Sequence, residues 1–280
     1  MSSADYFVTT DWLEAHLGEP DLAIIDGTFF MPDEGRNALA EYRAGHIPGA
    51  VFFDIDAIAD HSTNLPHMLP SPAQFADAMR TLGIDEKMRI VVYDASGLFS
   101  APRVWWTLRL FGAKNVKILA GGLPKWKEEG RALESGDVTR APQTFAVDLD
   151  ASCVSSAADV LAASQSGSAQ IVDARGAPRF LGQVAEPRPG LRSGHIPKSA
   201  NVPYRDVIEN GQTRAPEEIV EIFARAGIDF KKPIVTSCGS GVTAAILLLA
   251  LETAGKKGVR LYDGSWSEWG ARHDLPIEVG

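Results

Sequence analysis

An internal repeat constrains this chain most strongly, because two similar halves within 280 residues predict two similar domains. The first half carries AIIDGTFF, EYRAGHIPGAVFFDIDAI, MRIVVYDASGLFSAPRVWWTLRLFG and VKILAGGLPKWKEEG. The second half carries QIVDARGAPRF, GLRSGHIPKSANVPYRDVI, KPIVTSCGSGVTAAILLLALETAG and VRLYDGSWSEWG. The four blocks recur in the same order, so the fold of one half predicts the fold of the other.

Each half alternates short apolar or β-branched runs with longer helical segments. Strands are expected at 24–25, 89–93, 116–119, 171–172, 234–236 and 259–262, and helices at 71–82 and 215–226. This alternation is typical of βαβ units, so we expect two tandem α/β domains, each a mainly parallel sheet flanked by helices. We place domain 1 at 1–136, a linker rich in small and polar residues at 137–156, and domain 2 at 157–280.

Composition excludes several classes of function. The formal net charge of -9 opposes binding to nucleic acids or anionic membranes. The most apolar run, 244–251, is far shorter than the roughly 20 residues that cross a bilayer, so it is expected to be a buried helix. The N-terminus shows no export signal, which predicts a cytoplasmic protein. Two cysteines without metal-ligand spacing predict neither a disulfide framework nor a metal, and no cofactor is expected.

The segment PIVTSCGSGVTAAILLLAL carries the candidate nucleophile, Cys238. An apolar strand ends at Ser237 and a helix begins near Val242 or Thr243, so Cys238 lies at the carboxyl end of a strand, where α/β sheets bind ligands. Gly239 and Gly241 allow backbone N–H groups to turn inward as an anion-binding nest, and the helix N-terminus adds positive potential. These donors would stabilise a thiolate and a later persulfide.

The first half provides an internal comparison, because IVVYDASGLFSA aligns with IVTSCGSGVTAA and places Asp94 opposite Cys238. A carboxylate cannot replace a thiol nucleophile, so domain 1 is expected to be catalytically silent and to shape the site. A Cys-x5-Arg phosphatase is disfavoured, since Ala244 occupies the position of its arginine. A non-catalytic binding or sensor module remains an alternative.

The chain resembles the two-domain rhodanese family of sulfurtransferases over nearly its whole length. The resemblance rests on CGSGVTA at 238–244, on EPRPGLRSGHIP at 186–197, and on FFDID and HMLP in the first half. It implies transfer of sulfur from 3-mercaptopyruvate to a thiol such as thioredoxin, or to cyanide, through a Cys238 persulfide with release of pyruvate. Neutral loop side chains favour mercaptopyruvate, because relatives that prefer thiosulfate carry cations there. Thiosulfate:cyanide transfer is the alternative.

The resemblance also implies roles for individual residues. Arg179 and Arg188 would hold the substrate carboxylate and keto group, as a guanidinium can. The alternative is a solvated loop pair, or salt bridges to Glu186 and neighbouring acids. Together with the loop the two arginines form the expected substrate site: Arg179, Arg188, Gly239, Gly241, Val242 and Thr243. A relay of Asp56, His67 and Ser240 would assist Cys238 in moving protons, provided that the two domains meet over it. Ser240 could instead cap the helix, and His67 could form a hydrogen bond with a backbone group of a loop.

Other residues near the motifs receive plainer interpretations. His46 and His195, in the repeated GHIP motif, are expected to be structural. Arg192 could face solvent. Phe99 replaces a tyrosine that many relatives have before SAPR, so a hydroxyl is missing while an aromatic wall is kept. The sequence assigns no role to Cys153.

Overall fold

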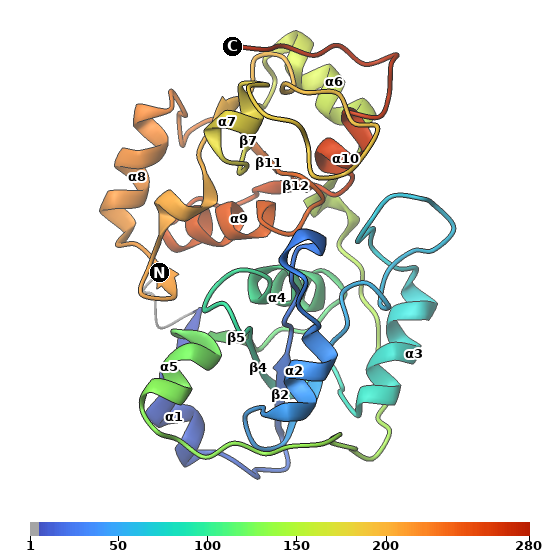
Figure 1. Cartoon of the computed structure of the whole chain (residues 1–280), viewed down its shortest axis with the longest axis vertical. Helices are drawn as coiled ribbons and strands as arrows, with labels where there is room; N and C mark the ends of the chain where they lie inside the picture. The colour runs from blue at the N-terminus through green and yellow to red at the C-terminus, as the bar shows by residue number, and fades with distance from the viewer. Residues whose placement is uncertain (1–5) are drawn as a thin grey trace.

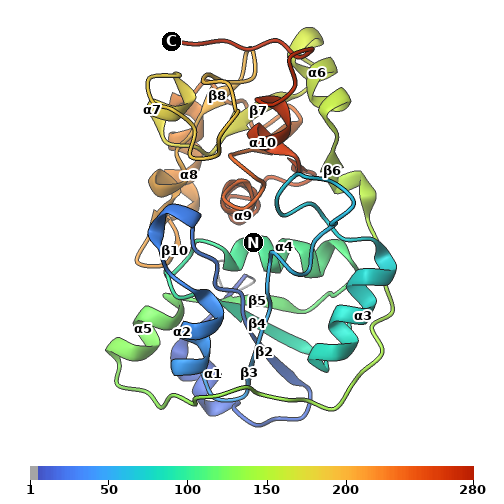
Figure 2. The same cartoon turned by 45° about the vertical axis from the view of Figure 1, so that its right-hand side comes forward.

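The computed structural model describes residues 6–280 and contains two five-stranded parallel sheets, one in each half of the chain (Figures 1 and 2). The strand order is β1-β5-β4-β2-β3 in the first sheet and β6-β12-β11-β7-β8 in the second. The first sheet consists of β1 (Phe7–Val8), β2 (Leu22–Asp26), β3 (Ala50–Phe52), β4 (Arg89–Tyr93) and β5 (Val116–Leu119). The second consists of β6 (Val154–Ser155), β7 (Gln170–Asp173), β8 (Ala200–Asn201), β11 (Ile234–Ser237) and β12 (Arg260–Tyr262). The predicted fold class and the repeat are therefore confirmed.

Helices cover both faces of each sheet. Domain 1 has α1 (Thr10–Ala15), α2 (Ala38–Ala44), α3 (Pro72–Leu82), α4 (Ala101–Leu110) and α5 (Gly122–Glu128). Domain 2 has α6 (Ala157–Ser166), α7 (Ala177–Phe180), α8 (Pro216–Arg225), α9 (Ala244–Thr253) and α10 (Ser265–Trp269). Short 3-10 turns occur at η2 (Pro32–Glu34), η3 (Ala151–Cys153) and η4 (Tyr204–Val207), and β9 (Ile208–Glu209) with β10 (Gln212–Thr213) forms a hairpin.

The two domains meet through α4 and α9, which lie between the two sheets (Figure 2). Every residue of α9 from Ala244 to Leu251 is buried, so the predicted buried helix is confirmed. One apolar cluster contains residues of both helices, and a helix that is apolar on all sides needs such cover. Because α4 and α9 each follow the central strand of their sheet, β4 and β11, the loops that precede them are brought to the interface.

The ends of α3 show why the sequence folds as predicted. Ser71 accepts a hydrogen bond from the Gln74 N–H while the Gln74 side chain accepts one from the Ser71 N–H, which forms a capping box. Pro72 opens the helix, and Gly83 closes it with a left-handed φ of 67°. The helix predicted at 71–82 therefore begins and ends within one residue of its expected bounds.

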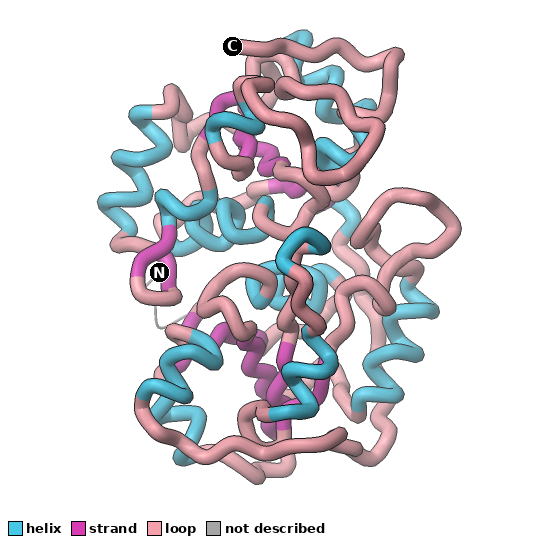
Figure 3. The backbone as a smooth tube through the Cα atoms, viewed as in Figure 1, coloured by secondary structure: helices cyan, strands magenta, loops and turns pink. Residues whose placement is uncertain are grey.

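The segment between α5 and η3 has no helix and runs along domain 1 before it enters domain 2 (Figure 3). Its Phe145 packs edge-on against Phe75, and its Asp148 N–H donates to the Phe111 carbonyl. The divisions at 1–136, 137–156 and 157–280 stay a prediction, and residues 1–5 lie outside the described residues. Because β6 lies in the predicted linker and pairs with β12, we propose that domain 2 starts with this strand. No helix in residues 6–280 is long and apolar enough to span a bilayer.

Candidate active site

Cys238 lies directly after β11 and is 1% exposed. The start of α10 holds the surrounding backbone: the Trp266 N–H donates to the Cys238 carbonyl at 2.9 Å, and the Ser267 N–H donates to the Gly239 carbonyl at 2.8 Å. The Cys238 N–H itself donates to Ser265 Oγ at 3.1 Å. Because these carbonyls point toward α10, the N–H groups of the residues after Gly239 can point away from α10.

The corresponding loop of domain 1 shows what this type of loop binds. The Asp94 carboxylate is fully buried, and its Oδ2 accepts hydrogen bonds from the N–H groups of Phe99, Ser100 and Ala101 at 2.7–2.9 Å. Its Oδ1 accepts one from the Ser96 N–H at 2.8 Å. The loop is therefore an anion nest at the N-terminus of α4, filled by its own carboxylate.

The corresponding loop of domain 2 carries Cys238 in the place of Asp94. In the repeat, Thr243 and Ala244 correspond to Phe99 and Ser100. Within residues 6–280, the N–H groups of Thr243 and Ala244 donate to no protein oxygen. They are available at the N-terminus of α9 for a negatively charged group on Cys238.

Domain 1 places His67 over this loop. His67 Nδ1 lies 3.1 Å from Ser240 Oγ and 3.3 Å from the Ser240 carbonyl oxygen, while its Nε2 lies 3.0 Å from Asp56 Oδ1. His67 is buried, and its edge packs against the Phe29 ring. Asp56 is exposed, and the hydrogen bond from His67 lowers the pKa of its carboxyl. Asp56, His67 and Ser240 thus form one hydrogen-bonded chain across the interface.

Arg179 lies beside the loop on the domain 2 side. A Cβ placed on Gly239 would be 3.1 Å from Arg179 Nη2, so this guanidinium lies against the Gly239 backbone. Its other face is held by Glu186, whose carboxylate is 1% exposed and accepts from both Nε and Nη2 of Arg179. Glu186 also accepts from Arg175 Nη1 at 2.8 Å. Arg179 therefore forms the ion pair with Glu186 that the sequence allowed, and that pair orients it toward the loop.

Arg188 is partly buried, and its electrostatic neighbours include Cys238, Arg179, Asp56 and Glu186. Burial lowers the pKa of its guanidinium. The structure thus groups Arg188 with Cys238 and Arg179 and brings the Asp56 end of the hydrogen-bonded chain to the same place.

Several predicted residues lie away from the nest. His195 Nδ1 bonds to the Phe180 carbonyl at 2.9 Å, and its ring stacks on Phe180. His46 repeats this arrangement with Tyr42, as expected for structural residues. Arg192 donates to the carbonyls of Trp269, Gly270, Arg272 and Leu275, so it secures the C-terminal segment instead of facing solvent.

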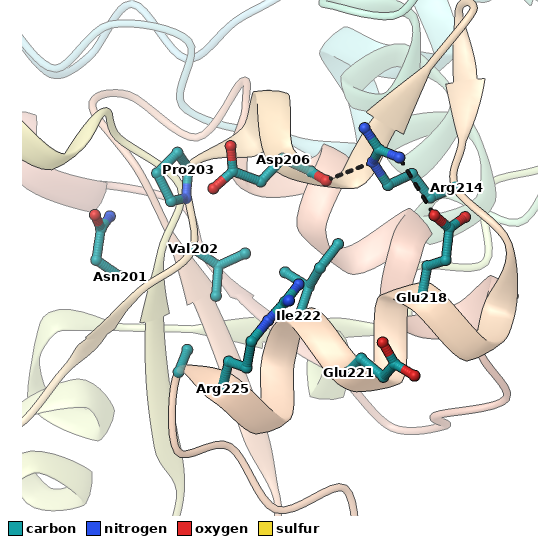
Figure 4. A pocket seen from close by; sticks show the side chains of 10 residues that line it. Asn201, Val202, Pro203, Asp206, Arg214, Glu218, Glu221, Ile222 and Arg225 are labelled. Atoms are coloured by element: carbon teal, nitrogen blue, oxygen red, sulfur yellow. Dashed lines mark hydrogen bonds and ion pairs between the residues drawn. The ribbon is translucent and has the colours of Figure 1, made fainter.

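Phe99 forms an aromatic wall with a partner in domain 2. Its ring packs edge-on against Tyr204 with 5.7 Å between centroids. Both rings line a groove of about 1110 Å³ between the domains. A second groove of about 670 Å³, beside α8 (Figure 4), is lined by Asp206, Arg214, Glu218 and their neighbours and contains none of the predicted site residues.

Sequence reasoning missed Arg103 and Asp263. Arg103, in α4, donates from Nη1 to Asp263 Oδ1 at 2.6 Å and from Nη2 to the His67 carbonyl at 2.6 Å. Both side chains are 4% exposed. A signal was present, because Arg103 ends the SAPR motif and a charged residue in a buried helix demands a partner.

Known proteins resemble the chain along almost its whole length. The family model described as "Rhodanese-like domain" matches residues 9–129 and 156–272. The 3-mercaptopyruvate sulfurtransferase of Escherichia coli K12 is 50% identical over 277 residues, which cover 99% of each chain. The mitochondrial thiosulfate/3-mercaptopyruvate sulfurtransferase 1 of Arabidopsis thaliana is 44% identical, over 99% of this chain and 79% of its own. The crystal structure of SseA from Escherichia coli superposes with a TM-score of 0.87 at 48% identity, over 93% of this chain and 98% of its own.

Proposed function

The chain belongs to the rhodanese family, and from that premise we propose that it is a 3-mercaptopyruvate sulfurtransferase. It moves sulfur from 3-mercaptopyruvate to a thiol or to cyanide through a persulfide on Cys238, and it releases pyruvate. The observation that carries this proposal is the nest of N–H groups around the Asp94 carboxylate, because Cys238 takes the place of Asp94 in the repeat. A site built for an anion favours a thiolate.

In the first half-reaction the Cys238 thiolate attacks the sulfur atom of 3-mercaptopyruvate. The S–S bond forms, the C–S bond breaks, and its electron pair leaves on pyruvate as the enolate, which then takes up a proton. Arg179 and Arg188 hold the carboxylate and the keto oxygen, where negative charge develops. Glu186 fixes the Arg179 guanidinium, so little side-chain freedom is lost when substrate binds.

In the second half-reaction an acceptor thiolate attacks the outer sulfur of the persulfide. The S–S bond to Cys238 breaks, its thiolate returns to the nest, and the acceptor leaves as a persulfide; cyanide leaves as thiocyanate. The two half-reactions make the cycle ping-pong.

The proton path consists of Ser240, His67 and Asp56. With Asp56 accepting from Nε2–H, the Nδ1 atom of His67 is free to accept from the Ser240 hydroxyl. Ser240 lies two residues after Cys238, so the path starts beside the reacting sulfur. Transfer of a proton to the enolate or from an acceptor thiol is general acid–base work of the kind a histidine performs.

The donor is 3-mercaptopyruvate because the loop side chains after Cys238 are neutral and the cationic groups, Arg179 and Arg188, suit a carboxylate. The test compares pyruvate release from 3-mercaptopyruvate with sulfite release from thiosulfate at equal concentrations. The proposal expects faster turnover of 3-mercaptopyruvate, and faster turnover of thiosulfate would overturn the donor assignment.

Thioredoxin as the acceptor and a cytoplasmic location are finer parts of the proposal. Cys153 and Cys238 are both free thiols, and a nucleophilic cysteine works in a compartment that keeps thiols reduced. Dithiol acceptors of the thioredoxin type work in the same reducing compartment.

A further inference from the structure

Arg103 connects the two loops that carry the proton path. Its Nη2 donates to the His67 carbonyl at 2.6 Å, and its Nη1 donates to the Gly241 carbonyl at 3.3 Å and to Asp263 Oδ1 at 2.6 Å. His67 belongs to domain 1, and Gly241 and Asp263 belong to domain 2. One guanidinium therefore bonds to both sides of the interface next to Ser240.

Asp263 adds a second hydrogen bond to the His67 segment, and we call the bonds of Arg103 and Asp263 to His67 and Leu69 the grip on this segment. Its Oδ2 accepts the Leu69 N–H at 2.8 Å, while Arg103, bound to its Oδ1, takes the His67 carbonyl. His67 has a φ of 60°, a left-handed conformation that costs energy for a residue other than glycine. The Arg103–Asp263 pair bonds to the carbonyl of this strained residue and to the N–H two residues later, so it stabilises the conformation that directs the imidazole at Ser240.

The active loop is fitted against the same pair. Gly241 has a φ of 79°, and a Cβ there would lie 2.8 Å from Arg103 Nη1 and 2.9 Å from the Asp263 carbonyl oxygen. The loop therefore packs on the guanidinium without space for a side chain. Movement of Arg103 would displace both the Gly241 backbone and the His67 carbonyl.

We propose that Arg103 and Asp263 are positioning residues that hold His67 against Ser240, so that the proton path forms only where the two domains are in contact. The proposal rests on the proposed function, because that function gives the proton path its work. It assigns no contact with substrate to either residue.

The chain offers a matched control in Arg109, six positions further along α4. Arg109 also crosses the interface, with Nη1 2.8 Å from Glu252 Oε2, and its guanidinium stacks on Trp105, as that of Arg103 stacks on Trp106. Within the described part of the chain, Arg109 bonds neither to the His67 segment nor to the loop at 238–243. Equal effects at Arg103 and Arg109 would mean that both merely join the domains.

The experiment compares Arg103→Lys with Arg109→Lys in rapid-mixing assays of the two half-reactions. A lysine keeps the charge but cannot reproduce the guanidinium fork. We expect transfer from the persulfide to a thiol to slow at least about tenfold in Arg103→Lys, as expected for a misplaced catalytic group. The kcat/KM for 3-mercaptopyruvate should stay within about twofold, because substrate contacts are untouched and this ratio reports only the first half-reaction of a ping-pong cycle. Arg109→Lys should match the wild type.

A double-mutant cycle decides whether Arg103 acts through His67. In a His67→Gln background, Arg103→Lys should cause no further loss, because the group that it positions is already absent. An equal loss in both backgrounds, or an equal loss in Arg109→Lys, would overturn the proposal. If Arg103→Lys fails to fold, Asp263→Asn replaces it, and we expect the same selective loss in the second half-reaction.

A readout without substrate separates this proposal from the proposed function. The Leu69 amide should exchange its hydrogen faster in Arg103→Lys than in the wild type, and at the wild-type rate in Arg109→Lys. Unchanged exchange in Arg103→Lys would refute the grip on the His67 segment. Absence of sulfur gain by the wild type would refute the proposed function. The hydrogen-exchange result would still test whether Arg103 and Asp263 hold the His67 segment.

Discussion

The Nδ1 atom of His67 in domain 1 lies 3.1 Å from the Oγ atom of Ser240 in domain 2. This contact joins domain 1 to the half of the chain that carries Cys238. In the proposed mechanism, domain 1 therefore contributes chemistry as well as shape, since His67 and Asp56 belong to it.

His67→Gln should slow transfer of the outer sulfur to a thiol by about a hundredfold, at the lower end of what general acid–base groups contribute. Loading of Cys238 with sulfur should continue, because the nest that stabilises the thiolate is backbone. Single-turnover assays of each half-reaction measure the two effects separately. His61→Gln is the control, since His61 is exposed and its ring bonds to the Ala57 carbonyl, with no hydrogen bond to Ser240 among residues 6–280. Unchanged transfer in His67→Gln would contradict the role of the relay.

Asp56→Asn should lower the free energy of unfolding only above the pH at which Asp56 ionises. The hydrogen bond from His67 lowers the pKa of Asp56 below the ordinary 3.8. The contribution of this carboxylate to the free energy of unfolding is therefore full above pH 3.8 and is lost as the pH falls through the lowered pKa. Because the carboxylate is 66% exposed, the difference should stay below about 1 kcal/mol. Urea unfolding at pH 6 and below pH 3.8 tests this, and a difference that grows in acid would contradict it.

Arg179→Lys and Arg188→Lys should each raise the KM for 3-mercaptopyruvate about tenfold, the equivalent of one charge-assisted hydrogen bond. Their effect on thermal unfolding should be small, since both side chains are partly exposed. Arg225→Lys, on the exposed surface of α8, serves as the control. Steady-state kinetics make the comparison, and an unaltered KM in both variants would exclude these arginines as substrate ligands.

Gly241→Ala and Gly239→Ala should differ in kind. At Gly241 the methyl group would meet Arg103 and the Asp263 backbone in a left-handed conformation, so we expect a loss of about 2–4 kcal/mol in unfolding free energy. At Gly239 it would meet only the far end of Arg179, which can shift, so stability should change by less than about 1 kcal/mol while KM rises. Urea titrations and steady-state kinetics on both variants measure this, and equal destabilisation would refute it.

The sequence predicted the fold because the repeat and the strand–helix alternation are local patterns. Strands at 89–93 and 116–119 match β4 and β5, and the helix expected near Val242 or Thr243 begins at Ala244. The available N–H groups of Thr243 and Ala244 were also foreseeable, since Gly239, Gly241 and the following helix are neighbours in the chain. Chain order alone could not place Arg103 against Asp263, which lies 160 positions away.

The support around the arginines was also hidden from the sequence. The sequence allowed a salt bridge between Arg179 and Glu186, but it did not show that the Glu186 carboxylate is buried between Arg175 and Arg179. Arg192 resembled a surface charge but binds four backbone carbonyls, because the C-terminal segment folds back onto it. Such partners depend on how distant segments pack, and local pattern does not encode that.

Weighing the intact protein by mass spectrometry, after brief exposure to 3-mercaptopyruvate without an acceptor, tests the central claim most directly. Our account predicts a gain of one sulfur atom, located on Cys238 by peptide mapping and absent from Cys238→Ser. Cys153→Ser should gain it normally, since burial raises the pKa of the Cys153 thiol and leaves it a poor nucleophile. No gain in the wild type, or a gain that persists in Cys238→Ser, would contradict the account.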